Sequence, residues 1–333
     1  SRWLRARTNF SLADSLDSIQ CGQQCRGEQL RETTLRLIRD FRKDILRGSI
    51  VPYSPHYHED YSQFSFIGGG SIGGKARGLE FMDTVLHRGI DKTLSGEMSV
   101  SIPRSLFIRT ALYDEFLESN NLVEFASACG SDEEIASRFS RSLLPAPLLE
   151  RLREFILREK APLAVRSSSL LEDSFYQTFS GIYSTVMLPN TGTDEDRFLS
   201  LAAAIQHVYA SAFFGNARKY VMNTGLAPAD EKMGVIIQEL CGARHGNLFY
   251  PDFSGIAQSA NFYPAPGAQP SDGVARVVAG LGTSITGGGF SLQFSPSHPG
   301  VLPQFNTIDD MLDYSQKTFH ALSLTNGDTS PLF

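Results

Sequence analysis

A glycine-rich segment, Ile67–Leu79, is the feature that most constrains how this 333-residue chain folds. The apolar residues Phe64 and Phe66 run directly into its glycines, and apolar residues at helical spacing follow it as far as Gly89. The pattern therefore predicts an apolar run, a tight turn and a helix. A bare glycine turn presents backbone N–H groups to anionic oxygens, and Lys75 adds a positive charge at its end. The segment predicts a binding site for phosphate groups.

Two familiar nucleotide fingerprints overlap in this turn, and both are incomplete. Its glycines spell G-x-G-x-x-G, but a dinucleotide-binding fold also needs a strand that ends in an acidic residue about 20 residues later. The residues before Asp91 instead read as the end of a helix. Gly69–Lys75 also spells G-x-x-x-x-G-K, but a P-loop continues with Ser or Thr, where this chain has Ala76. The turn keeps its lysine for phosphate, while a metal ion would have to be bound elsewhere.

A second motif places an arginine at the end of a short apolar strand, Leu163–Val165. Arg166 is followed by three serines and then by the acidic pair Glu172 and Asp173. Two interpretations stay open: a structural ion pair between Arg166 and one of these acids, or a planar guanidinium group that holds phosphate oxygens. In combination with Lys75, the second interpretation predicts a polyphosphate site, with ATP as the leading ligand.

The composition argues against several other classes of function. A net charge of −6 gives no general attraction to nucleic acid or anionic membrane, and no apolar stretch is long enough to span a bilayer. Four cysteines are too few for a disulfide scaffold and fit a reducing compartment, so we expect a cytoplasmic protein without nucleic-acid or membrane partners. A homodimer stays open. The pair Cys21 and Cys25 and the segment His56–Asp60 are weak metal candidates, so the metal ligands stay unknown.

The periodicity of apolar residues predicts an α+β architecture. Helices are expected over residues 28–47, 111–119, 131–157 (interrupted by Pro145 and Pro147), 194–220 and 307–322, the last with Thr307 as N-cap. Strands are expected over residues 100–108, 163–165, 233–240 and 275–279. We predict three parts: a helical N-terminal extension with a linker (residues 1–62), a first subdomain with both motifs (residues 63–230) and a second subdomain (residues 231–333).

Several short motifs follow one another along residues 64–300, and their order is more specific than any one of them. They are Gly73–Lys75, Val165–Ser168 with Glu172 and Asp173, Phe179–Thr185, Ile237–Leu240, Ser254–Ala257 and Gly280–Gly282. In this order they resemble the N-terminal nucleotide-binding domain of the pyruvate phosphate dikinase and phosphoenolpyruvate synthase family. The resemblance implies an ATP-grasp-type fold, in which two α+β subdomains close on ATP.

The resemblance implies that the phosphate groups of ATP lie at the first two motifs. Gly73 and Gly74 would form the turn beside the phosphates. Lys75 and Arg166 would hold the phosphate oxygens and form the catalytic pair. Two cations at these positions suit the chemistry, because the ligand is a polyanion.

The same resemblance implies roles on the ribose and adenine sides of the nucleotide. Gly181 and Thr185 would lie against the phosphate and the ribose. Gln238 would approach the nucleotide, and the backbone of Glu239 and Leu240 would pair with the adenine edge.

The implied function is that of an ATP-binding domain in an ATP-dependent phosphotransferase, which would use ATP and Mg²⁺ to phosphorylate a histidine on a separate domain. The phosphohistidine domain, the pyruvate-binding domain and the metal-binding residues of the family have no counterpart before Phe333, so we expect the enzyme to be incomplete in this chain. Thr283 stands where the family usually has glutamate. This departure keeps an alternative open, a nucleotide-binding regulatory module without catalysis.

Overall fold

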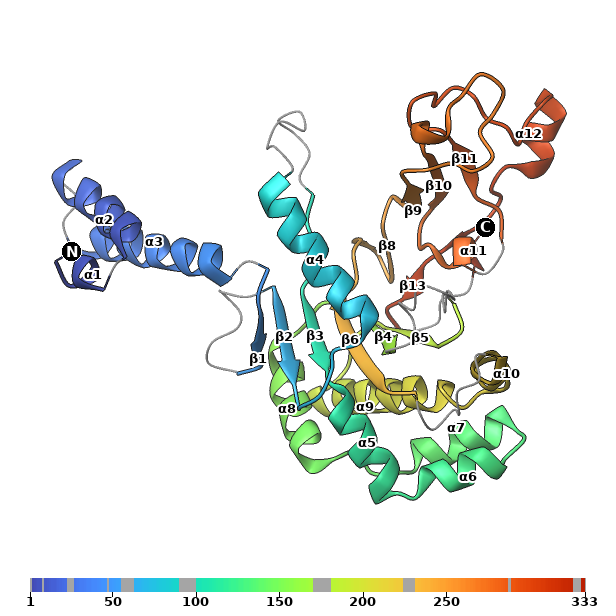
Figure 1. The fold of residues 1–333 in the computed structure, drawn as a ribbon, viewed down its shortest axis with the longest axis horizontal. Coiled ribbons are helices and arrows are strands. Elements are labelled where there is room, and N and C mark those ends of the chain that lie inside the picture. Colours follow the sequence, from blue (N-terminus) through green and yellow to red (C-terminus); the bar gives the residue numbers. More distant parts are fainter. Residues whose placement is uncertain are drawn as a thin grey trace.

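The computed structural model describes residues 2–7, 9–22, 27–46, 48–54, 63–89, 100–169, 181–223, 231–286, 289–325 and 331–332. Within these residues the fold is α+β, as predicted (Figure 1). A six-stranded sheet lies at its centre, helices pack on both faces, and small sheets follow in the C-terminal part.

The main sheet has the strand order β1-β2-β3-β6-β4-β5. Its strands are β1 (Ile50–Pro52), β2 (Phe64–Ile67), β3 (Ser105–Ile108), β6 (Met233–Glu239), β4 (Leu163–Ser169) and β5 (Thr185–Leu188). The first three run parallel, β6 is antiparallel to both of its neighbours, and β5 is antiparallel to β4. β3, β4 and β6 are nearly continuous runs of buried residues, which is the pattern of strands covered on both faces.

Side chains that alternate along β3 enter two different hydrophobic cores. Leu106 faces the larger core, which contains residues of α5 (Thr110–Ser119) and α9 (Asp194–Ser211). Phe107 faces the smaller core under α4 (Gly74–Gly89). Each face of the sheet therefore has its own helices, and the helix that follows the glycine turn belongs to the smaller core (Figure 1).

Caps and prolines set the ends of the helices around the larger core. Besides α5 and α9, these helices are α6 (Leu122–Ala128), α7 (Asp132–Ser140), α8 (Ala146–Arg158) and α10 (Gly215–Asn223). Thr193 begins α9 in a capping box, and the helix predicted over residues 194–220 divides into α9 and α10. The region predicted as helical over residues 131–157 is interrupted between α7 and α8, as predicted, and Pro145 is the N-cap of α8. Pro147 does not interrupt the helix, because it lies in the first turn of α8, where a missing N–H group costs no hydrogen bond.

Short antiparallel sheets make up the C-terminal part of the chain. Its strands are β7 (Ala243–His245), β8 (Leu248–Tyr250), β9 (Phe253–Gln258), β10 (Val274–Ala279), β11 (Leu292–Phe294), β12 (Phe319–His320), β13 (Leu322–Ser323) and β14 (Pro331–Leu332). Its helices are α11 (Thr283–Thr286), α12 (Ile308–Tyr314) and a 3-10 helix, Pro270–Asp272. The strand orders are β13-β8-β7, β11-β10-β9 and β12-β14.

The helix predicted over residues 307–322 is shorter in the structure. It begins after the capping residue Thr307, as predicted, but α12 ends at Tyr314, and the residues that follow form β12 and β13. The prediction is wrong there because Leu322 is fully buried and lies opposite Phe249 of β8. Burial of this side chain in a sheet core outweighs the helical spacing of the apolar residues.

The main sheet cuts across the predicted division of the chain. β6 falls in the predicted second subdomain (residues 231–333), but it is hydrogen-bonded between β3 and β4. β1 falls in the predicted N-terminal extension (residues 1–62), but it pairs with β2. The three-part division stays a prediction, since the sheet draws strands from all three parts.

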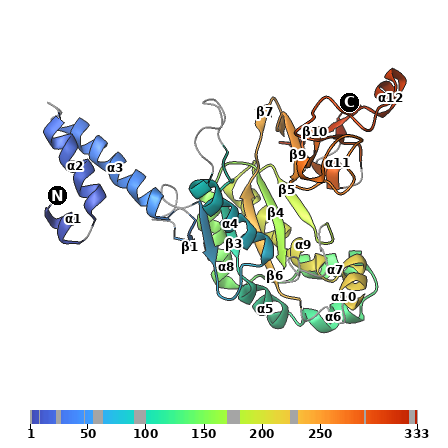
Figure 2. The ribbon, with the colours of Figure 1, turned by 45° about the horizontal axis from the view of Figure 1, so that its top comes forward.

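In the described part of the N-terminal region, three helices precede the main sheet: α1 (Arg2–Ala6), α2 (Phe10–Gly22) and α3 (Glu28–Leu46). The last matches the helix predicted over residues 28–47. Figure 2 shows these helices to one side of the sheet, beyond its β1 edge. Among the described residues no single helix is long and apolar enough to cross a bilayer, and the bent pair of α9 and α10 passes the same test only jointly, by length and composition.

Candidate functional site

The glycine turn packs directly against the end of β4. Gly73 has a backbone φ of +81°, and a Cβ atom built on it would lie 1.8 Å from the carbonyl oxygen of Ser168. Any other residue at this position would strain the backbone and overlap the strand. A position without a side chain therefore brings the first motif into contact with the second.

Hydrogen bonds within the protein use several N–H groups of the turn. The Ser71 N–H donates to Oγ1 of Thr110 at 3.0 Å, and the Gly73 N–H donates to Oγ of Ser71 at 3.2 Å. The Ala76 N–H, in the first turn of α4, donates to Oγ of Ser168 at 3.1 Å. These three donors hold the turn in place, so they are not the ones that it would offer to a phosphate.

Lys75 lies beside the second motif. Its Nζ atom donates a hydrogen bond to Oγ of Ser167 at 3.1 Å. Ser167 is fully buried in β4 and directly follows Arg166. The fold thus brings the lysine of the turn to the strand that carries the arginine.

Arg166 is half-buried on β4, the strand beside the edge strand β5. In the strand register it lies opposite Thr185 of β5 and Ile236 of β6. Residues directly opposite one another share a face, so these three lie on the face that carries α4. Within the described parts of the chain, the Arg166 side chain makes no hydrogen bond or ion pair. The alternative partners Glu172 and Asp173 lie outside the described residues.

Gln238 lies on the same face, two positions beyond Ile236 along β6. Its side chain is buried, and its Nε2 donates to Oγ of Ser105 at 3.0 Å. A primary amide has two N–H donors and a carbonyl acceptor, so this bond orients the group without using its full capacity. Arg166, Thr185 and Gln238 therefore present an arginine, a hydroxyl and an amide on one face.

Glu239 and Leu240 end β6, away from the glycine turn. The Glu239 N–H donates to the carbonyl of Arg104 at 3.0 Å, and the Leu240 N–H donates to the carbonyl of Pro162 at 2.8 Å. An adenine edge at this pair would therefore meet carbonyl acceptors and not N–H donors, unless these bonds break. The predicted pairing of the adenine edge with the backbone of Glu239 and Leu240 is therefore limited to their carbonyl groups.

The carboxyl group of Glu239 has a positive and a negative side chain near it. One of its oxygens lies 3.4 Å from Nε of Arg104. Burial raises the pKa of the Glu239 carboxyl group, and the neighbouring Glu159 raises it further, while Arg104 acts in the opposite direction. Side chains alternate along a strand, so this carboxyl group lies on the face opposite Gln238.

Lys75 of the glycine turn, the Arg166 motif on β4 and the strand β6 all lie within one segment that matches a known protein family. Residues 70–306, more than half of the chain, match the family model described as pyruvate phosphate dikinase, AMP/ATP-binding domain. The chain belongs to this family. No curated protein matches the sequence. The family match confirms the resemblance based on Lys75, Arg166 and the later motifs, and it includes every predicted site residue.

Two positions of this pyruvate phosphate dikinase domain, Gly181 and Thr283, take no part in the contacts described above. Gly181 is exposed with a φ of +80°, and no atom lies within 4 Å of a Cβ built on it. Thr283 begins α11, and its Oγ1 is shielded from solvent. It lines a pocket of about 360 Å³ with Ser284, Gly289, Phe290, Gln316, Lys317, Thr318 and His320.

The metal ligands of the domain are not identified among the described residues. Among them, no three His, Cys, Asp or Glu side chains lie together in a group that could hold an ion. Around Lys75 and Arg166 the described side chains offer cations and hydroxyls, which do not fit a divalent cation. The ligands of magnesium stay unknown, and we derive no step through it.

Sequence reasoning missed two arginines beside the glycine turn, Arg77 and Arg109. Arg109 directly follows the strand predicted over residues 100–108, as Arg166 follows its own apolar strand. The same signal, an arginine at the end of a buried strand, could therefore have found it.

Proposed function

We propose that this domain binds ATP with its phosphates at Lys75 and Arg166, and that the whole protein uses ATP to phosphorylate a histidine on a separate domain. The hydrogen bond between Nζ of Lys75 and Oγ of Ser167 is the observation that supports it most strongly. This bond brings the two sequence motifs into contact in the fold. The family to which the chain belongs is one of AMP/ATP-binding domains.

The two cations would act differently on the phosphates. The guanidinium group of Arg166 is a planar fork that matches two phosphate oxygens, while the Lys75 ammonium acts as a compact point charge. The contact with buried Ser167 fixes the position of the ammonium group without reducing its charge. Phosphoryl transfer depends mostly on positioning and on stabilising the charge of the phosphates, and two cations would supply that charge stabilisation.

The length of β6 suits an extended nucleotide. Gly234 lies against the glycine turn, since a Cβ built on it would come 2.9 Å from the carbonyl oxygen of Ile72. From there to Glu239 the strand spans roughly 16 Å, at about 3.3 Å per residue. With the phosphates at the turn, Thr185 and Gln238 would lie along the ribose side, and a backbone carbonyl group of the Glu239–Leu240 pair would accept from the adenine amino group.

The remaining components belong to the same proposal. Magnesium would neutralise the charge of the phosphates when it is bound. The phosphohistidine-carrying and pyruvate-binding domains of the family would be the partners, the domain would act in the cytoplasm, and a homodimer stays open. A catalytically silent nucleotide-binding regulatory module is the second candidate, and it is favoured by one observation, Thr283 in place of the usual glutamate.

Nucleotide-dependent thermal unfolding tests the proposal. A ligand that binds only the folded state raises the melting temperature, so ATP and ADP should raise it at millimolar concentration. GTP should do less, because its base has a carbonyl oxygen where adenine has the amino group that would face the Glu239–Leu240 carbonyls. No shift with any adenine nucleotide would count against the proposed site. Phosphohistidine formation in the full-length protein separates a catalytic domain from the regulatory module.

A further inference from the structure

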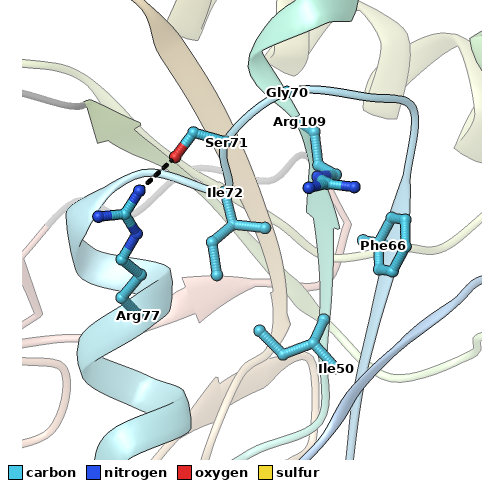
Figure 3. Close-up of a pocket in the computed structure, with 7 residues that line it drawn as sticks. All are labelled: Ile50, Phe66, Gly70, Ser71, Ile72, Arg77 and Arg109. Carbon is cyan, nitrogen blue, oxygen red and sulfur yellow. Dashed lines mark hydrogen bonds between the residues drawn. The ribbon is translucent and has the colours of Figure 1, made fainter.

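A second pocket lies beside the glycine turn, between α4 and the edge strands of the main sheet (Figure 3). Its volume is about 470 Å³, within the usual range of small-molecule sites. It is lined by Ile50, Phe66, Gly70, Ser71, Ile72, Arg77 and Arg109. None of these residues is a predicted contact of ATP, and neither Lys75 nor Arg166 lines the pocket.

Two guanidinium groups line this pocket, from different elements. Arg109 follows β3, and its guanidinium carbon lies 4.6 Å from the centre of the Phe66 ring. Arg77 belongs to α4, and one of its terminal nitrogens donates to Oγ of Ser71 at 2.9 Å (Figure 3). In the described parts of the chain, neither arginine pairs with a carboxylate. The pocket therefore concentrates positive charge without a described counter-charge.

One nitrogen of Arg109 lacks a hydrogen-bond acceptor. Its Nε is shielded from solvent and has no hydrogen-bond partner among the described residues. A shielded donor without an acceptor is unfavourable, and the cost is removed when the guanidinium group turns so that a ligand supplies one. An oxyanion between Arg77 and Arg109 would supply acceptors to both groups and would reduce the repulsion between them.

The rest of the wall is apolar. Ile50, Ile72 and the Phe66 ring line the pocket below and beside the arginines (Figure 3). Such a wall favours a ligand with a short carbon body over a bare inorganic ion. We propose that this pocket binds a small organic oxyanion, a carboxylate or a phosphate monoester with a short apolar body, at the same time as the domain binds ATP.

Calorimetric titration with phenyl phosphate and with benzoate tests this site, in the absence of nucleotide and with saturating ATP. The two probes share an apolar ring and differ in the oxyanion, so they separate a phosphate ligand from a carboxylate ligand. We expect at least one of them to bind with and without ATP, and inorganic phosphate and benzyl alcohol to bind at least tenfold more weakly. Benzyl alcohol that binds as tightly as the anions would overturn the proposal, because charge would then play no part.

Variants locate the binding. Arg77→Gln and Arg109→Gln should each weaken the anion by about tenfold or more. Arg141→Gln, an exposed arginine on α7's C-terminal side, should leave it unchanged. If Arg109→Gln fails to fold, the Arg77→Gln variant, in which an exposed side chain is changed, still tests the site by the loss of anion binding. Binding that survives Arg77→Gln, or that is displaced by ATP and lost in Lys75→Ala, would overturn the proposal. The titration without nucleotide reports on this pocket even if ATP does not bind.

Discussion

The ammonium nitrogen of Lys75 lies 3.1 Å from the hydroxyl oxygen of Ser167, 92 residues further along the chain. Ser167 directly follows Arg166, so this contact joins a glycine turn and an arginine strand that are unrelated in sequence. The turn reaches this position because Gly73 packs on the backbone of Ser168.

Gly73→Ala should destabilise the domain by more than about 2 kcal/mol, because it adds a positive-φ strain and an overlap with Ser168. Gly78→Ala is the matched control on α4, since no atom lies within 4 Å of a Cβ built on it. A helical glycine with free space should gain about 0.5–1 kcal/mol when replaced by alanine. Urea unfolding measures both changes, and equal stabilities of the two variants would contradict the described packing.

Ser168→Ala should cost about 1–3 kcal/mol of unfolding free energy, because the Ala76 N–H loses its acceptor inside the protein. Ser200→Ala on the exposed surface of α9 is the control, and its stability should change by less than about 0.5 kcal/mol. Thermal and urea unfolding of both variants check the prediction. A Ser168 variant as stable as the Ser200 variant would show that this bond does not hold the turn on β4.

Glu239→Gln should stabilise the domain more at neutral pH than at about pH 4. The pKa of the Glu239 carboxyl group is raised, by burial first and then by Glu159. A raised pKa means that Glu239 contributes stability below its unfolded pKa, and this contribution is lost as the pH rises through the folded pKa. Glutamine does not ionise, so the Glu239→Gln variant does not undergo this loss of stability as the pH rises. The difference in urea midpoint between variant and wild type, measured across this range, should therefore increase with pH. A difference that decreases would show that the ion pair with Arg104 dominates.

Much of the site could be predicted because its chemistry is local in the sequence. The glycine turn, the lysine at its end and the arginine at the end of an apolar strand are each read from a few adjacent residues. The family match confirms that the segment which carries them is an AMP/ATP-binding domain, and the roles of the individual residues stay predictions. Their contact through Ser167 and Ser168 could not be predicted, because it depends on the order of strands in the sheet.

Other features of the fold could not be read from the sequence for the same reason, because they depend on contacts between distant segments. Nothing in the sequence around β6 shows that it lies between β3 and β4, so the predicted boundary at residue 231 passes through the main sheet. Leu322 has the spacing of a helical residue, but it is buried opposite Phe249 in a small sheet. The adenine edge was assigned from a motif, whereas the hydrogen bonds of the Glu239 and Leu240 N–H groups depend on Arg104 and Pro162 from distant segments.

The central claim is that Lys75 and Arg166 bind the phosphates of ATP, and calorimetric titration of the single alanine variants with ATP and with AMP tests it most directly. Each variant should remain folded and lose on the order of 1.5–3 kcal/mol of ATP binding free energy. The loss for AMP should be smaller, because AMP lacks the outer phosphates. Lys219→Ala and Arg141→Ala, two exposed cations elsewhere, should bind both nucleotides as the wild type does. Folded Lys75 and Arg166 variants that bind ATP with wild-type affinity would contradict the account.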